Sequence, residues 1–589
     1  MDLIYGAFSL SKKIISEPAA SFTKVFNPTS FLSQGPFYVG LKRNICTKKQ
    51  DPFIFRDESN KIITTLTGQI TNRQQLCREE SLDDITDAIL VTQLYRKYGI
   101  NVTTKLNGLF SVVLFDYAKR KIYIFQDPYA STQFFYWIVV EDTLYFSTSL
   151  KILINIGNFK RKVNDRGLLN LLVNGVILSD ETLMDGVFKL MPGKYLTSAG
   201  GKIKIETLPE RRTFIEIKNT EEAKKSYCAI FMEIMKDLIE ESDKLGIALG
   251  AGYDSNFNLA CLKKIYLKDI AAIGVGCDDF RDESYLAAQI ATSYPSTKFY
   301  KAMHNSQIIL NLPEIVWILE GAVYESGIFL SYLLSKTAKS LGINKLICGE
   351  GANEILSKNR LLSTSSLKYR ILSKCYNLYK TSFFIRKIYD HPFFERLIKH
   401  KLTEHWYPID ASYYLKRHYD VERRLYFLSP YQLTTNLILK KSGIMHSSFS
   451  LCPVYPYFDE RFVQLSAFLY EINKTKKLYH NQMVKNMVSA KVKALLKSQG
   501  GKTPIEINLI NQEIRKRIFK YLNNSKFLAN YINMDIIRNW MDAYEGNLAI
   551  ANQLIGILYF NIWHEIFIDG RFDSEINREF FTHSLKDFI

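Results

Sequence analysis

Short runs of apolar residues, spaced as in β-strands, dominate the chain up to about residue 210. A single helix, from about Asp84 to Tyr98, is predicted among them because its apolar residues recur at helical spacing. The strand Lys61–Thr67 is expected to end in a turn at Gly68. The other predicted strands are 110–116, 121–125 and 143–147. This succession predicts an α/β sandwich of mostly antiparallel sheets in a first domain, 1–210.

The pattern changes after about residue 215, where helical spacing is interrupted by a few apolar runs. The runs 245–249, 269–276 and 345–348 predict strands, and each is followed by a segment of helical character. Strands that alternate with helices favour a parallel sheet with helices on both faces. We therefore predict a second, doubly wound α/β domain over 215–589, with further helices added to it.

A strand, a glycine-bearing loop and a helix follow one another around residue 250. The helix is predicted over Asn256–Lys264. Free backbone N–H groups at a helix start attract anions, and glycines let phosphates approach closely. Asp254 is a candidate ligand for Mg²⁺, and Ser255 is a candidate hydrogen-bond donor. The proposed phosphate-binding residues are Leu249, Gly250, Ala251, Gly252, Tyr253, Asp254 and Ser255. The alternative is a tight turn that binds nothing.

A second glycine-rich turn, Gly349-Glu350-Gly351, follows the predicted strand 345–348. Doubly wound sheets bind ligands at the carboxyl ends of their strands. Gly349 and Gly351 are therefore further candidates for contact with a nucleotide. A purely structural turn is the alternative.

Composition narrows the classes of protein. The chain has 589 residues and a net charge of +18, but its basic residues are dispersed and form no nucleic-acid-binding motif. The eight isolated cysteines predict neither disulfides nor a zinc site and suit a reducing cytoplasm. No apolar run is long enough to span a membrane, and the N-terminus does not resemble a signal peptide.

The loop at residues 250–255 resembles the Ser-Gly-Gly-x-Asp-Ser loop of ATP pyrophosphatases, with Gly250 and Ala251 at the first two positions. The segments before it resemble, in order, the glutaminase domain of asparagine synthetase B. Those segments are Thr67–Asn72, Thr86–Asp87, Leu106–Phe110, Phe115–Asp116, Asp127–Tyr129, Phe135–Tyr136, Tyr145–Ser149 and Met191–Tyr195. The resemblance implies an Ntn-hydrolase-like first domain and an ATP pyrophosphatase second domain, with ATP and Mg²⁺ as cofactors.

The first domain departs from that family at its reactive residues. The family's glutaminases use an N-terminal cysteine, whereas position 2 is Asp2 and the first cysteine is Cys46. A carboxylate does not replace a thiolate that attacks an amide. Thr67 stands where the family has an asparagine, and Asp87 matches its glutamine-holding aspartate. We interpret the domain as an inactive glutaminase kept as a scaffold, with Asp87 structural.

The second domain retains most of the family pattern. The family's Gly-Glu-Gly-x-Asp-Glu turn supplies a second Mg²⁺ ligand, which is Asn353 here, and Glu350 would bind metal or position the attacking amine. The family's catalytic lysine neutralises charge on the acyl-adenylate and the leaving phosphates. Its closest equivalent is Lys497, with Lys502 as the substitute. Pro453–Val463 resembles the segment that packs under the site.

Family members without the cysteine include lasso peptide cyclases, and the length and helical C-terminal region most resemble these. That resemblance implies adenylation of an Asp or Glu side chain of a precursor peptide, followed by attack of its α-amine to form a macrolactam. A leader peptidase and a leader-binding protein would be partners. Three alternatives stay open. They are a small-molecule amidoligase similar to asparagine or β-lactam synthetases, an inactive ATP-binding homologue, and a tRNA-modifying pyrophosphatase.

Overall fold

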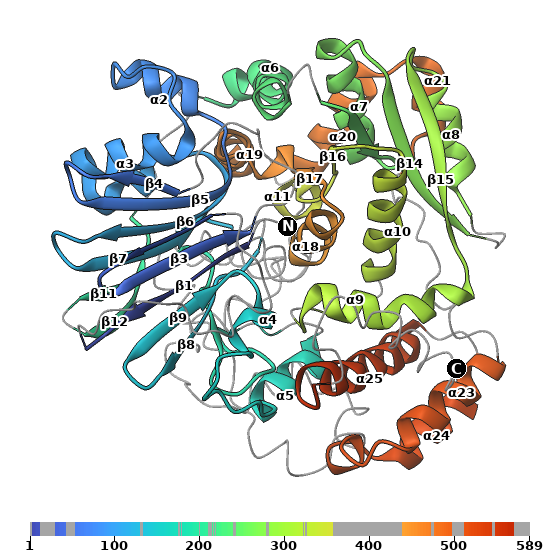
Figure 1. The fold of residues 1–589 in the computed structure, drawn as a ribbon. Helices are drawn as coiled ribbons and strands as arrows, with labels where there is room; N and C mark the ends of the chain where they lie inside the picture. The colour runs from blue at the N-terminus through green and yellow to red at the C-terminus, as the bar shows by residue number, and fades with distance from the viewer. Residues whose placement is uncertain are drawn as a thin grey trace.

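The computed structural model describes residues 3–11, 30–42, 54–356, 439–497 and 512–570, apart from short interruptions. Figure 1 shows the N-terminal strands stacked on one side and the later strands on the other, with helices filling the space around them. The segment 357–445, whose many aromatic and basic residues predict a helical subdomain, lies almost entirely outside the described residues. The same holds for Asp2 and Lys502.

Two six-stranded antiparallel sheets make up the first region. The first sheet has the order β10-β8-β9-β1-β3-β2, and the second has the order β12-β11-β7-β6-β5-β4. The strands of the first sheet are β1 (Leu3–Ser9), β2 (Ser30–Gln34), β3 (Phe37–Lys42), β8 (Tyr136–Val140), β9 (Thr143–Ser147) and β10 (Phe188–Lys189). Those of the second are β4 (Ile54–Asp57), β5 (Ile62–Ile70), β6 (Gly108–Asp116), β7 (Lys121–Gln126), β11 (Lys194–Ala199) and β12 (Lys202–Thr207).

Alternation of side chains along the strands builds the sandwich. In β6, Val113 and Phe115 enter the core between the two sheets, where they meet residues of β1 and β3 such as Phe37. Val112 and Leu114 point to the opposite face and pack under helix α3 (Asp87–Tyr98). The predicted α/β sandwich is confirmed.

Two local predictions in this region were wrong in detail. Strand β5 does not turn at Gly68 but continues to Ile70, with Gly68 at a φ of +94°. A Cβ at Gly68 would lie 2.1 Å from the carbonyl oxygen of Leu109, so glycine is needed because β6 approaches closely. The helix expected from Asp84 begins at Asp87.

The second region is built on a five-stranded sheet of order β15-β14-β13-β16-β17, whose neighbouring strands are all parallel. Its strands are β13 (Leu245–Ala248), β14 (Ile270–Cys277), β15 (Thr297–His304), β16 (Lys345–Ile347) and β17 (Cys452–Val454). The three predicted strands are thus present and parallel, with β13 and β16 adjacent. The doubly wound prediction is confirmed.

Helices pack around this sheet and extend beyond it (Figure 1). Those nearest the sheet are α6 (Thr220–Leu238), α7 (Tyr253–Ile265), α8 (Ser284–Ala291), α10 (Gly327–Ser340), α11 (Ala352–Leu356), α18 (Lys440–Ser448), α19 (Glu460–Ile472), α20 (Lys476–Met487) and α21 (Ala490–Leu495). The predicted helical tail contains α23 (Gln512–Asn523), α24 (Met534–Asp542) and α25 (Leu548–Phe567), the last packed on α9 (Leu312–Leu319). No helix of the described residues is long and apolar enough to cross a membrane.

A shared core joins the two regions. One continuous apolar cluster contains Tyr5 and Phe134 from the first region and Trp563 from the second. Where the two regions meet, the buried carboxylate of Glu320 accepts hydrogen bonds from the Ser149 hydroxyl at 2.5 Å and the Leu150 amide at 2.6 Å. A buried carboxylate is costly unless it is hydrogen-bonded, so these contacts fix how the two regions meet.

Candidate functional site

The loop after β13 is closed by side chains of the helix that follows it. Helix α7 begins at Tyr253 rather than at the predicted Asn256, so Asp254 and Ser255 lie in its first turn. The side-chain amide of Asn256 donates to the carbonyl oxygens of Gly250 at 3.0 Å and Gly252 at 2.7 Å. The loop is therefore preformed, and a negative charge is favourable at this helix start.

The departure from the family at Ala251 has a structural reason. Ala251 is 3% exposed and belongs to the core around the parallel sheet. Its methyl group therefore packs in the core. Gly250, in contrast, is exposed, and a Cβ there would have only the Gly252 nitrogen nearby, at 4.0 Å. The open side of the loop is thus left clear at Gly250.

The two glycine-rich turns lie side by side. A Cβ at Gly349 would be 3.7 Å from the Cβ of Asp254. The strand order brings them together. From β13 the chain adds β14 and β15 on one side of that strand, and it then returns to form β16 on the other side. Such a reversal opens a crevice at the carboxyl ends of the two central strands. Sequence reasoning proposed both turns but had no means to place them together.

The segment Pro453–Val463 supports both turns from below, as its family resemblance implies. Val454 accepts a hydrogen bond at 2.9 Å from the amide of Cys348, just before the second turn. The Tyr457 hydroxyl donates to the carbonyl oxygen of Asp254 at 3.0 Å. Gly351 has a φ of +96°, and a Cβ there would lie 2.5 Å from the Phe458 ring. Glycine is required at 351 for both reasons.

Lys497 reaches the first loop from the far end of the chain. Its backbone amide donates to the carbonyl oxygen of Ala251 at 2.9 Å, and it pairs as a parallel bridge with Gly252. Its side chain is half exposed, with the ammonium 3.9 Å from a carboxylate oxygen of Glu283. A cation is therefore anchored beside the loop through the main chain, which leaves its side chain available for a ligand.

A buried histidine that sequence reasoning missed lies beside the proposed metal ligand. Nε2 of His480, on α20, lies 3.1 Å from a carboxylate oxygen of Asp254, and its Nδ1 lies 2.9 Å from the Tyr227 hydroxyl. If Tyr227 donates to Nδ1, the neutral ring carries its proton on Nε2, facing Asp254. A lone histidine in a helix gave no sequence signal.

We expect His480 to act as a positioning residue for Asp254. Replacing it by Phe should weaken the apparent Mg²⁺ affinity about 10- to 100-fold, as for other groups that orient a ligand. The Mg²⁺ dependence of AMP release measures this, with His480→Gln as the conservative variant that restores a donor. An unchanged Mg²⁺ dependence, with only a lower Tm, would mean that His480 serves packing alone.

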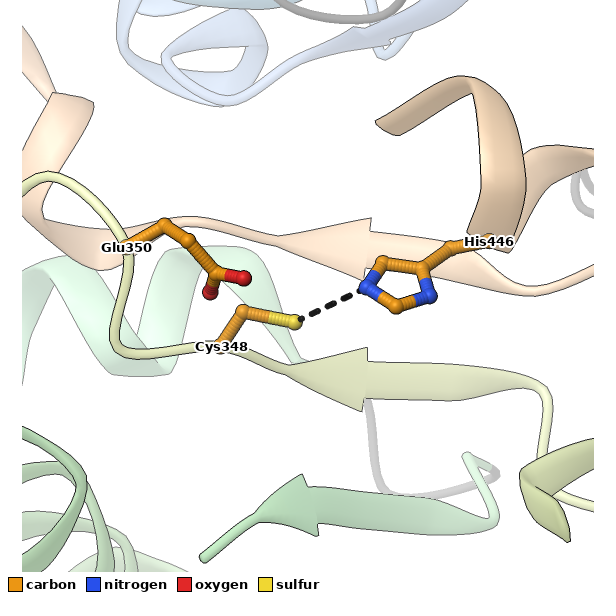
Figure 2. Close-up of side chains that lie close together, drawn as sticks. All are labelled: Cys348, Glu350 and His446. Atoms are coloured by element: carbon orange, nitrogen blue, oxygen red, sulfur yellow. Dashed lines mark hydrogen bonds between the residues drawn. The ribbon is translucent and has the colours of Figure 1, made fainter. Parts of the chain in front are cut away.

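Asn353 is exposed in the short helix α11, directly after the second turn. Glu350 is partly buried, and its carboxylate turns toward Cys348 and His446 (Figure 2). Burial raises the pKa of Glu350 above its ordinary value. The roles of these residues and of Lys497 stay predictions.

A cavity of about 220 Å³ adjoins the first loop. It lies between that loop, the end of β14 and the start of α8, and Ala248, Gly250, Val275 and Leu334 contribute to its lining. Asp282, at its rim, accepts hydrogen bonds from Lys301 at 2.7 Å and from the Ser284 amide at 2.9 Å. Burial would raise the pKa of Asp282, but these donors outweigh it and lower the pKa.

The matching positions of the first region are engaged in its own structure. One carboxylate oxygen of Asp87 accepts from the Ile70 amide at 2.9 Å, and the other lies 3.8 Å from Arg73. Thr67 is buried. A larger cavity, about 670 Å³, lies by α3 away from both glycine-rich turns, and its lining pair Glu80 and Lys97 is already joined at 2.7 Å. We therefore place the functional site at the turns.

Comparison with known proteins agrees with this geometry. A family model described as "Asparagine synthase" matches residues 231–565, which is more than half of the chain. This chain belongs to the asparagine synthase family. A second model, described as "Glutamine amidotransferase domain", matches residues 44–208. Membership identifies the chain as an ATP-dependent, AMP-forming amide ligase.

Several relatives are similar over long stretches. Asparagine synthetase [glutamine-hydrolyzing] 1 of Bacillus subtilis is 22% identical over 89% of this chain and 88% of its own length. Amidase chyE of Penicillium rubens is 22% identical over 51% of this chain and 48% of its own length. Asparagine synthetase [glutamine-hydrolyzing] of Bos taurus is 25% identical over 49% of this chain and 53% of its own length. The similarity to asparagine synthetase thus extends over both regions of this chain, at low sequence identity.

Proposed function

We propose that this chain is a lasso peptide cyclase, which closes a macrolactam between the α-amine of a precursor peptide and an Asp or Glu side chain. The observation that carries this proposal is the contrast between its two regions. The synthetase turns are assembled with Asp254 and Lys497 beside one loop. The first 45 residues, in contrast, contain no cysteine that would release ammonia from glutamine. The attacking amine then comes with the substrate.

In the proposed reaction, a substrate carboxylate oxygen attacks the α-phosphorus of ATP, and pyrophosphate leaves. The resulting acyl-adenylate is attacked by the amine, which loses a proton as AMP leaves. Backbone N–H groups of the loop and of the start of α7 would bind the phosphates. Lys497 would neutralise the charge that develops on the phosphates. The cavity beside Val275 would take the adenosine part of ATP.

Mg²⁺ fits the carboxylate that this site offers. Asp254 is 19% exposed, stands in the first turn of α7 and has its Cβ beside Gly349 of the second turn. It would hold the ion, which would supply charge neutralisation to the phosphates when bound. Asn353 would add a neutral oxygen ligand, which weakens binding relative to an aspartate.

The test is substrate-dependent release of AMP and pyrophosphate from ATP and Mg²⁺ by the full chain. The probes are synthetic peptides with a free α-amine and an internal Asp or Glu at varied separation. We expect AMP release and a product lighter than the peptide by one water. An N-acetylated peptide should give no lactam, and the Asn or Gln analogue should give no AMP. AMP release with aspartate and ammonium, or with tRNA, but with no peptide would contradict the proposal.

A further inference from the structure

Three side chains with metal-binding atoms converge behind the second glycine-rich turn (Figure 2). Cys348 directly follows β16, Glu350 comes two residues later, and His446 belongs to α18. One ligand atom of each lies within 4.8 Å of those of the other two. We propose that Cys348, Glu350 and His446 bind a thiophilic divalent cation, Zn²⁺, with a fourth position open to water.

The separation of the sulfur and nitrogen donors suits a tetrahedral ion. The Cys348 sulfur lies 3.7 Å from Nε2 of His446. A zinc ion about 2.3 Å from sulfur and about 2.1 Å from nitrogen, at the tetrahedral angle, separates these two atoms by about 3.6 Å. The pair is therefore already at the separation that a bound ion would impose, and little rearrangement is needed.

The hydrogen bonds of His446 leave Nε2 as the ligand atom. The Ser335 hydroxyl donates to the carbonyl oxygen of Ser331 at 2.6 Å and lies 2.8 Å from Nδ1 of His446. A hydroxyl has one proton, so its oxygen accepts from Nδ1–H, and Nε2 then presents a lone pair toward Cys348. An N–H held in this way fixes the tautomer and the ring orientation of metal-bound histidines.

The donor set suits a divalent cation at this buried place. Cys348 and His446 are fully buried. A neutral imidazole is the form that binds metal. Zn²⁺ with one thiolate and one carboxylate carries no net charge, which suits a buried site beside the cation of Lys441. The sulfur and imidazole donors select Zn²⁺ rather than Mg²⁺.

The site lies next to the proposed nucleotide loop but does not depend on the proposed reaction. Gly349, between two of the ligands, is the residue that packs against Asp254. An ion bound to Cys348 and Glu350 would therefore fix the turn that contacts the first loop. It would assign to Glu350 a metal-binding role in place of amine positioning.

Metal content of the full chain tests the inference. After incubation with Zn²⁺ and gel filtration, the wild type should retain one zinc per chain. With Co²⁺ instead, it should develop a sulfur-to-cobalt charge-transfer band in the near ultraviolet. Cys348→Ser and His446→Asn should each lose the band and the metal. The matched control, Cys277→Ser, changes a buried cysteine at the end of β14, which β13 separates from β16 in the sheet, and should retain both.

Two results would overturn the inference. The first is a folded wild type, judged by circular dichroism, that retains no zinc and gives no cobalt band. The cluster would then be a buried hydrogen-bond network. The second is retention of the cobalt band by Cys348→Ser, which would place the bound metal on another thiol. The wild-type cobalt spectrum keeps the test decisive even if a variant fails to fold.

Discussion

Replacing Asp254 by Asn abolishes AMP and pyrophosphate release, by at least about 10³-fold in kcat/KM, if this carboxylate holds Mg²⁺ on the phosphates. Metal-held charge stabilisation is worth several kcal/mol, and about 1.4 kcal/mol corresponds to a factor of ten. Asn keeps the size of the side chain and an oxygen near His480, so the loop should keep its shape. Pyrophosphate release at varied Mg²⁺ concentration measures the loss.

The control for this variant is Asp269→Asn. Asp269 is an exposed carboxylate just before β14, at the opposite end of the sheet from the loops. The Asp269→Asn variant undergoes the same change of charge as Asp254→Asn and should keep wild-type activity and Mg²⁺ dependence. Asp254→Asn with unchanged activity would remove Asp254 from the metal site and, with it, the central assignment of the loop.

The second large effect on activity is expected when the side chain of Lys497 is removed. We expect Lys497→Ala to lower kcat about 10²- to 10³-fold, the range for losing one group that stabilises transition-state charge. The Kd for ATP should change little, because the bond from the Lys497 amide to Ala251 belongs to the main chain and persists in the variant. The exposed pair with Glu283 contributes little to stability. Single-turnover AMP formation and equilibrium ATP binding separate the two quantities.

Two further variants make this result specific. Lys493→Ala removes an exposed cation one turn earlier, on α21, and should leave kcat unchanged. Lys502→Ala tests the substitute lysine, which lies outside the described residues. An active Lys497→Ala beside an inactive Lys502→Ala would transfer the catalytic role to Lys502.

The residues that sequence reasoning missed share a physical property. His480, Tyr227 and Tyr457 act on Asp254 through contacts that join α20, α6 and the segment after β17 to the start of α7. None belongs to a local pattern of ligand spacing, because each lies far along the chain from its partner. The cysteines were likewise interpreted as isolated, since Cys348 meets His446 only through the packing of α18 on β17 and α10.

The sequence by itself determined several of the strands and where the two glycine-rich turns occur. Strand β9 has the predicted bounds, because alternation of side chains and a bounding turn are local properties. It also identified Asp254, Glu350 and Lys497 as candidates. The tertiary structure alone decided which of these meet. Placing β16 beside β13 brings the turns together, and pairing with Gly252 draws Lys497 to the loop. Strand order and long-range pairing depend on burial of the whole sheet, and no local stretch of sequence encodes them.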